Sequence, residues 1–130
     1  RIEIWKWSIS SIQEHPALGV GIGNFPVVLR QNIRLADAGS SAHNIYLHIA
    51  AEMGIPALVA AIWALWLICW RALQRFLTEQ DPLLVTYWAG TVLFVPWVAI
   101  YSLTDVALFD ERAFLLFVTT VALIMTPSHE

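Results

Sequence analysis

The sequence predicts an all-α integral membrane protein, with about three transmembrane helices that follow an outer loop carrying short amphipathic helices. Composition is the first reason: 58% of the 130 residues are hydrophobic, 13% are charged, and the mean hydropathy is +0.66. An ordinary soluble domain has about 25% charged residues. The second reason is that long apolar segments begin after residue 44. We therefore expect the outer loop at residues 1–44 and the transmembrane region at residues 45–130.

The same composition excludes a disordered protein, a disulfide scaffold and a nucleic-acid-binding protein. The formal net charge is only −3, so no strong positive field attracts a polyanion. The single cysteine, Cys69, lies in an apolar run and has no intramolecular disulfide partner. The chain starts with Arg1 rather than Met and shows no signal-peptide pattern, from which we expect a piece of a longer protein.

The first expected element is an amphipathic helix that lies on a membrane surface or on a helical bundle. Its apolar residues recur at helical spacing and form one face, made of Ile2, Trp5, Ile9 and Ile12. His15 ends the helix, because a residue that precedes a proline avoids the helical conformation. A glycine-rich turn follows, and Asn24 is the expected N-cap of the next helix, Phe25 to Leu35.

The glycine spacing in this turn, Gly19-x-Gly21-x-Gly23, resembles a phosphate-binding loop only superficially, because no strand precedes it. We interpret it as a tight turn between surface helices. The alternative, in which its backbone amides approach a phosphorylated ligand, stays open. Ser40 or Ser41 is the expected cap of the long helix that follows.

Three apolar segments are candidates for membrane spans. The first runs from Ile45 to Trp70, and Gly54 and Pro56 are expected to kink it. The second runs from Leu83 to Tyr101 without a formal charge, and the third from Ala113 to Met125 is short for a span.

The arginines that follow the first span predict its orientation. Arg71 and Arg75 are expected in the short loop between the first two spans, and basic residues in short loops favour the cytoplasmic side. Residues 1–44 and 102–112 should then face the opposite compartment, the periplasm or the exterior.

Several residues carry chemistry that suits a site. Arg30 and Arg34 are four residues apart and share one helical face. This face is solvated, or lies against lipid headgroups, or forms an anion clamp. His43 is expected in the first turn of the long helix, as a capping residue or a general base. His48 and Glu52 are four residues apart and are expected to pair. His43 and His48 face different directions on one helix, and no His/Cys cluster occurs, so we expect no metal site.

Two strings of residues together resemble the O-antigen ligase and O-antigen polymerase family, across essentially the whole chain. The first is Arg1-x-x-x-Trp5, followed by His15-Pro16-x-x-Gly19-x-Gly21-x-Gly23-x-Phe25. The second is Ser41-Ala42-His43-Asn44-x-Tyr46-Leu47, followed by Ala51-Glu52-x-Gly54. The family includes lipopolysaccharide O-antigen ligases, polysaccharide polymerases and protein O-oligosaccharyltransferases.

The resemblance implies a metal-independent, inverting C-type glycosyltransferase, multi-pass in the bacterial inner membrane, with its active face toward the periplasm. It implies an undecaprenyl-diphosphate-linked glycan as the donor, a hydroxyl acceptor such as lipid A-core, contact with membrane lipids, and no cofactor. By position, Arg1 matches a motif arginine that binds the diphosphate, and His43 matches the motif histidine that acts as general base.

The remaining candidates complete the expected substrate site. Arg30 and Arg34 lie in the family's variable loop and are candidates by their chemistry alone, whereas Asn44 and Glu52 lie in the second string. A transporter or flippase fragment, with Glu52, His43 and Asp105 along a substrate path, is the alternative from another class. A structural subdomain that packs against a catalytic partner is a further alternative. We expect the isolated piece to be inactive.

Overall fold

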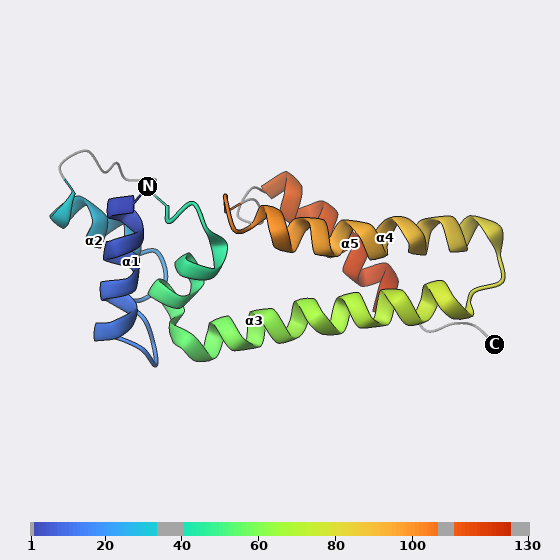
Figure 1. Ribbon diagram of the computed structural model, residues 1–130, viewed down its shortest axis with the longest axis horizontal. Coiled ribbons are helices and arrows are strands. Elements are labelled where there is room, and N and C mark those ends of the chain that lie inside the picture. Colours follow the sequence, from blue (N-terminus) through green and yellow to red (C-terminus); the bar gives the residue numbers. More distant parts are fainter. Residues whose placement is uncertain (1, 34–40, 107–110, 126–130) are drawn as a thin grey trace. The chain divides into compact units, whose positions relative to one another are not determined.

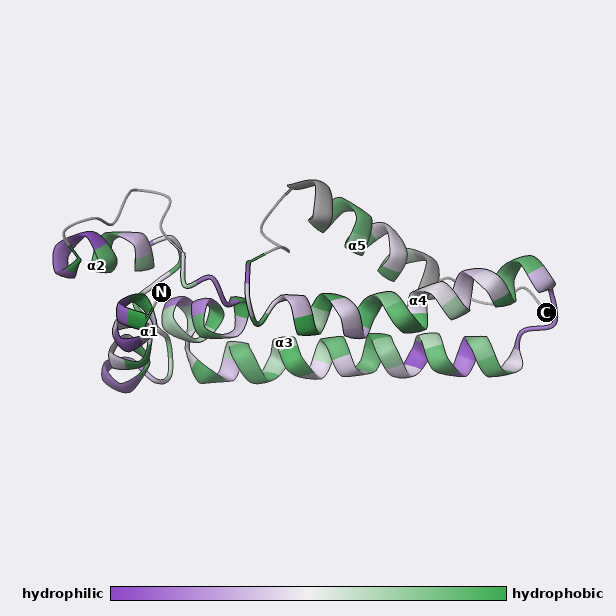
Figure 2. Ribbon diagram, turned by 45° about the horizontal axis from the view of Figure 1, so that its top comes forward, coloured by the Kyte–Doolittle hydropathy of each residue, from purple (hydrophilic) through white to green (hydrophobic). Residues whose placement is uncertain are grey.

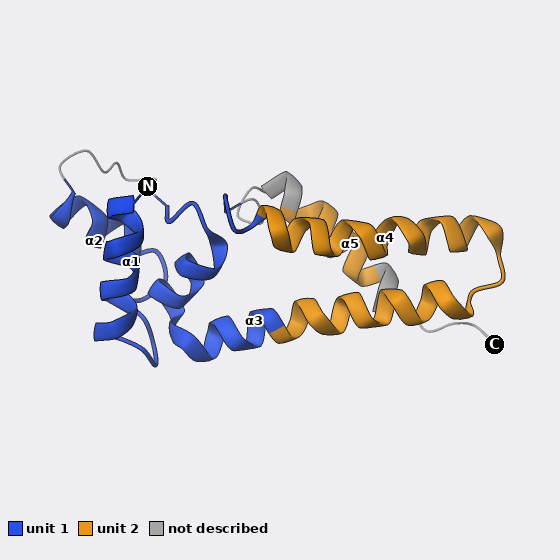
Figure 3. Cartoon of the chain, in the orientation of Figure 1, with its two compact units in different colours: residues 1–62, 102–106 blue, residues 63–101, 107–130 orange. Residues whose placement is uncertain are grey.

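The computed structural model describes residues 2–33, 41–106 and 111–125, and within them the chain forms helices without any strand. The helices are α1 (Ile2–Glu14), α2 (Phe25–Asn32), α3 (Ile45–Thr78), α4 (Pro82–Tyr101) and α5 (Glu111–Met125) (Figure 1). The all-α prediction is confirmed. The chain divides into two compact units, unit 1 with residues 1–62 and 102–106, and unit 2 with residues 63–101 and 107–130 (Figure 3).

In unit 1, α1 has the predicted length but packs through a face that only partly overlaps the predicted one. Ile2 and Ile9 of the predicted apolar face are 74% and 48% exposed, whereas Ser8 and Ser11 are buried. The buried hydroxyl of Ser8 donates to the carbonyl of Ile4 one turn earlier, which satisfies it within the helix. Small side chains on this face let α1 approach the core closely, and the neighbouring apolar residues Ile4, Trp7 and Ile12 pack against the cluster Phe25, Leu29, Ala42 and Ala51.

The second helix is shorter than predicted, because Ile33 is already extended, with φ −122° and ψ 117°. Asn24 occupies the N-cap position as expected, but its side chain does not cap the helix. Its Nδ2 donates instead to the carbonyl of Val20, at 3.0 Å.

The predicted kink in α3 is confirmed at Gly54, which has φ 85° and ψ 174° inside the helix. The break leaves helical carbonyls without their usual donors, since Pro56 carries no N–H for the carbonyl of Glu52. The preceding glycine turn supplies the missing bonds. Val20 N–H donates to Ala51 O at 2.8 Å, Gly21 N–H to Glu52 O at 2.9 Å, and Ile55 N–H to Pro16 O at 2.8 Å.

Glycine is required at both surfaces where the glycine turn contacts α3. A Cβ at Gly19 would collide with the main chain of Glu52, and a Cβ at Gly54 with the carbonyl of Ala17. Both glycines also have positive φ values, 65° and 85°. The glycine turn therefore stabilises the broken helix through main-chain hydrogen bonds. The sequence interpretation, a tight turn between surface helices, missed this role.

Two helices, α3 and α4, are long and apolar enough to cross a membrane. Hydrophobic residues cover most of both helices (Figure 2), and apolar side chains such as Trp63 and Leu93 are exposed, as lipid contact requires. The expected third span is not supported in the described residues, because α5 has only 15 residues and a span needs about 20.

In unit 2, α3 continues to Thr78, so Arg71 and Arg75 lie in its last turns rather than in a loop. Residues 79–81 connect α3 to α4. Asp81 caps α4, since its Oδ1 accepts from the N–H of Leu83 at 2.8 Å. Ala72 and Trp88 form the small core of this unit.

Candidate functional site

The candidate site of unit 1 centres on His43, which lies before α3 rather than in its first turn. His43 is half-buried, and its φ of 48° places it in the left-handed region. Among the described non-glycine residues it is the one with a positive φ. Such a conformation costs about 1–3 kcal/mol and persists only where the surroundings determine it. The prediction of a helical His43 was wrong because the helix is capped one residue later.

Asn44 is the residue that caps α3. Its Oδ1 accepts from the N–H groups of Tyr46 and Leu47, at 3.0 and 3.1 Å. Its Nδ2 donates to the carbonyl of Leu103 at 3.0 Å, and the N–H of Ile45 donates to Ser102 O at 2.9 Å. Asn44, buried in the unit, thus joins the start of α3 to the segment at residues 102–106.

The predicted serine cap is corrected by the same geometry. Ser41 Oγ accepts from the N–H of His43 at 3.3 Å, so it acts one residue before the cap and not on α3 itself. Ser40 lies outside the described residues.

The residue before His43 is held by two side chains. Trp5 Nε1 donates to the carbonyl of Ala42 at 2.9 Å, across 37 residues of sequence. The N–H of Ala42 in turn donates to His48 Nδ1 at 3.5 Å. Ala42 is completely buried, and both of its main-chain polar groups have a side-chain partner.

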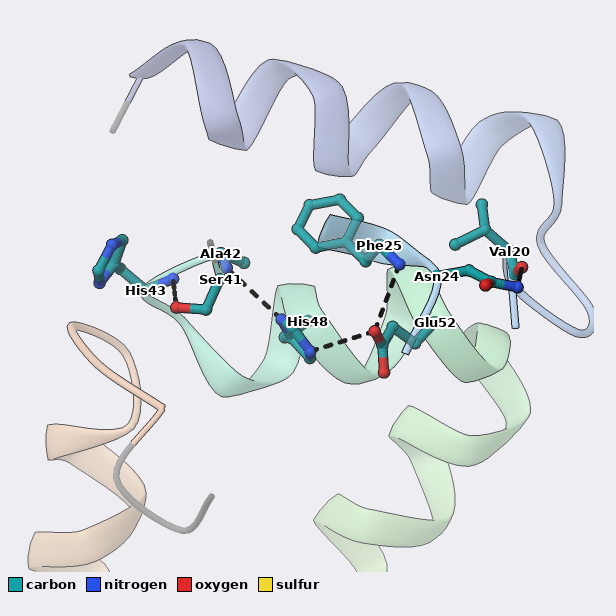
Figure 4. A network of polar contacts seen from close by, with 8 residues as sticks. All are labelled: Val20, Asn24, Phe25, Ser41, Ala42, His43, His48 and Glu52. Atoms are coloured by element: carbon teal, nitrogen blue, oxygen red, sulfur yellow. Dashed lines mark hydrogen bonds and ion pairs between the residues drawn. The ribbon is translucent and has the colours of Figure 1, made fainter. Parts of the chain in front are cut away.

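The predicted pairing of His48 with Glu52 is confirmed, with Nε2 and Oε1 3.5 Å apart and both side chains about one-tenth exposed (Figure 4). Because Nδ1 of His48 accepts a hydrogen bond, the proton of the neutral ring lies on Nε2 and faces the carboxylate. Oε1 of Glu52 also accepts from the N–H of Phe25, at 3.4 Å. The ring of Phe25 meets His48 edge-on, with centroids 5.5 Å apart.

The expected arginines are placed only in part. Arg30 is exposed in the last turn of α2, while Arg1 and Arg34 lie outside the described residues. Asp105 is half-buried, and its Oδ1 accepts from the N–H of Val106 at 2.8 Å. The structure therefore joins residues 42–44 to the pair of His48 and Glu52 through the main chain of Ala42, and it leaves the arginine cluster as a prediction.

Sequence reasoning missed Trp5 as a hydrogen-bond donor to this region. Its apolar character assigned it to a helical face, although the first motif string contains it together with Arg1. The indole N–H is the one hydrogen-bond donor of a tryptophan side chain, and it often finds a partner. This rule is the only signal in the sequence that Trp5 forms a hydrogen bond, because helical spacing does not indicate which group accepts from the indole.

A comparison with protein families matches residues 1–62 to the family described as O-antigen ligase. The match confirms the resemblance for this part of the chain, and it contains both motif strings and all of unit 1 except residues 102–106. The matched family is of the ligase and polymerase type of membrane enzyme. A search of curated proteins found no match.

Proposed function

We propose, on the premise that residues 1–62 match the O-antigen ligase family, that the chain is part of an inner-membrane glycosyltransferase of bacteria. It transfers a glycan from an undecaprenyl-diphosphate carrier to a hydroxyl group of lipid A-core. In this proposal residues 1–44 form the outer, periplasmic loop, and residues 45–130 form the transmembrane region. Membrane lipids surround the apolar helices, and neither a metal nor a cofactor takes part.

The observation that carries the proposal is the conformation of His43. A left-handed, non-glycine residue is strained, and strain of this kind gathers at active sites. The match to the motif histidine and the imidazole chemistry of a proton acceptor support the same residue. His43 also directly precedes Asn44, the cap of a helix that is long and apolar enough to cross a membrane.

The reaction follows from these parts. The acceptor oxygen attacks the anomeric carbon while the bond from that carbon to the diphosphate oxygen breaks, and the electron pair leaves with the lipid diphosphate. His43 accepts the proton of the attacking hydroxyl. A single displacement inverts the configuration at the anomeric carbon.

Arginines offset the charge that develops on the leaving diphosphate, since a guanidinium matches phosphate oxygens with two parallel hydrogen bonds. Arg1 takes this role by its motif position, and Arg30 and Arg34 are candidates by chemistry. Asn44 and Glu52 complete the proposed substrate site. In the structure Asn44 donates to the carbonyl of Leu103, and Glu52 contacts the N–H of Phe25 and the ring of His48.

The test is glycan transfer by the full-length protein in lipid vesicles, with the lipid-linked donor and, separately, lipid A-core, a glycan polymer and a protein as acceptors. His43→Ala should lower the rate about 10²–10⁴-fold at an unchanged amount of folded protein. His15→Ala is the matched control, because His15 is exposed and lies outside the proposed machinery. A normal rate in His43→Ala would overturn the base assignment, and transfer only to polymer or protein would correct the acceptor.

A further inference from the structure

We propose that Trp5, His48 and Glu52 are positioning residues for His43, acting through the main chain of Ala42. The inference rests on the proposed role of His43 as the base. Trp5 and His48 do not need to touch the substrate, and the part that Glu52 plays here, through His48, is separate from its place in the proposed substrate site. Their part is to fix the peptide groups that lead into His43, so that its imidazole points in one direction.

The first step concerns the peptide bond between Ala42 and His43. Its carbonyl accepts from Trp5 Nε1 at 2.9 Å, and its N–H donates to Ser41 Oγ at 3.3 Å. A peptide group is planar, so bonds at both ends fix its orientation. The left-handed φ of His43 is measured from this fixed plane.

The second step concerns the peptide group on the other side of Ala42. Its N–H donates to Nδ1 of His48. Nδ1 can accept this hydrogen bond only while the proton of the neutral ring lies on Nε2. Glu52 lies at Nε2 and favours that tautomer, in the way that a carboxylate orients an imidazole. Glu52 therefore acts on Ala42 through His48 (Figure 4).

The third step is the fixed residue that follows. Asn44 caps α3 and contacts the carbonyl of Leu103, so the chain after His43 is also held. His43 thus lies between two anchored neighbours, which explains how a strained residue keeps its conformation. Loss of one anchor should let the backbone relax and move the imidazole. A misplacement of about 1 Å in an active site can cost about 10²-fold in rate.

The first test uses Trp5→Phe, which removes the indole N–H and keeps an aromatic ring. We expect kcat to fall about tenfold or more, with KM for the lipid-linked donor unchanged. Trp7→Phe is the matched control on the same helix, and it should keep a normal kcat. Rates are taken per amount of folded, membrane-inserted protein. A normal kcat in Trp5→Phe would overturn the inference.

The second test separates the two ring nitrogens of His48 and does not depend on Trp5. His48→Asn places an amide oxygen near the position of Nδ1 and keeps an acceptor for Ala42. His48→Gln keeps a donor toward Glu52 but lacks that acceptor. The Asn variant should retain several-fold more kcat than the Gln variant. Equal or reversed rates would show that the Ala42 contact does not matter.

The third test combines Trp5→Phe with His43→Ala. If Trp5 acts through His43, the double variant should transfer no more slowly than His43→Ala alone. A further tenfold loss would assign Trp5 a role independent of His43 and overturn the inference. A normal rate in His43→Ala itself would overturn the proposed function. A slow His43→Ala with a normal Trp5→Phe would reject only the positioning role.

Discussion

The main-chain N–H of Phe25, the first residue of α2, lies 3.4 Å from Oε1 of Glu52, which belongs to α3. The first N–H groups of a helix have no partner within the helix. A carboxylate is favourable there, because it meets the positive end of the helix dipole. Glu52 therefore does for α2 what the side chain of Asn24 does not do from the cap position.

Loss of the Glu52 carboxylate should destabilise unit 1. Glu52→Ala leaves the N–H of Phe25 and the Nε2–H of His48 without their acceptor, so we expect the free energy of unfolding to fall by about 1–3 kcal/mol. Glu52→Gln keeps an acceptor oxygen and should lose less. Thermal unfolding of the purified protein in detergent measures both. The exposed Glu14→Ala serves as control, and equal stability of all three variants would contradict the prediction.

A side chain at Gly54 should be far more damaging than one at Gly23. Both glycines have positive φ, 85° and 75°, so Ala is strained at either position. At Gly54 a Cβ also collides with the carbonyl of Ala17, whereas at Gly23 it meets nothing within 4 Å. We expect Gly23→Ala to cost about 1 kcal/mol and Gly54→Ala clearly more. The melting temperatures of the two variants, measured side by side, test this difference. Similar values would contradict the close packing of the glycine turn against Gly54.

The two asparagines at helix starts should behave differently. Asn44→Ala removes the cap of α3 and the contact to Leu103, and should cost about 0.5–2 kcal/mol or more. Asn24→Ala removes only an exposed hydrogen bond to the carbonyl of Val20 and should lower the free energy of unfolding by only a few tenths of a kcal/mol, about 0.5 at most. Urea unfolding followed by circular dichroism compares them. A larger loss in Asn24→Ala than in Asn44→Ala would reverse the assignment of the cap.

The proposed orientation predicts which positions react with a membrane-impermeant thiol reagent. In a Cys69→Ala background, Gln80→Cys should stay unlabelled in intact spheroplasts, because the connection after α3 is placed in the cytoplasm. Leu18→Cys should be labelled, since Leu18 is 82% exposed in the glycine turn and belongs to the outer loop. Labelling after permeabilisation confirms that both thiols are present. Labelling of Gln80→Cys but not of Leu18→Cys in intact spheroplasts would show that the topology is the opposite of the proposed one.

Local features of this chain follow from its sequence, and long-range ones do not. The end of α1 at His15-Pro16, the kink at Gly54 and the pairing of His48 with Glu52 depend on neighbours within one or two turns. The packed face of α1 was missed in part, because burial of Ser8 depends on how closely another element approaches. The bond from Trp5 to Ala42 spans 37 residues, and no periodicity encodes it.

The candidate site divides in the same way. His43 and Asn44 were identified from their motif, but their backbone geometry was not, since the motif does not say which residue caps the helix. The cap at Asn44 leaves His43 outside the helix and invalidates the helical comparison of His43 with His48. The arginines Arg1 and Arg34 lie outside the described residues, so the assignment of Arg1 rests on its motif position and that of Arg34 on its chemistry.

The hydrogen bonds between the glycine turn and the break at Gly54 also restrict where this part of the chain can gain or lose a residue. Pro16 O meets Ile55 N–H on one side of the break, and the N–H groups of Val20 and Gly21 meet Ala51 and Glu52 on the other. An inserted or deleted residue between Pro16 and Val20 would shift every later donor out of register with its carbonyl. Related sequences should therefore keep a constant count of residues here, even where the chemical nature of exposed positions such as Leu18 drifts freely.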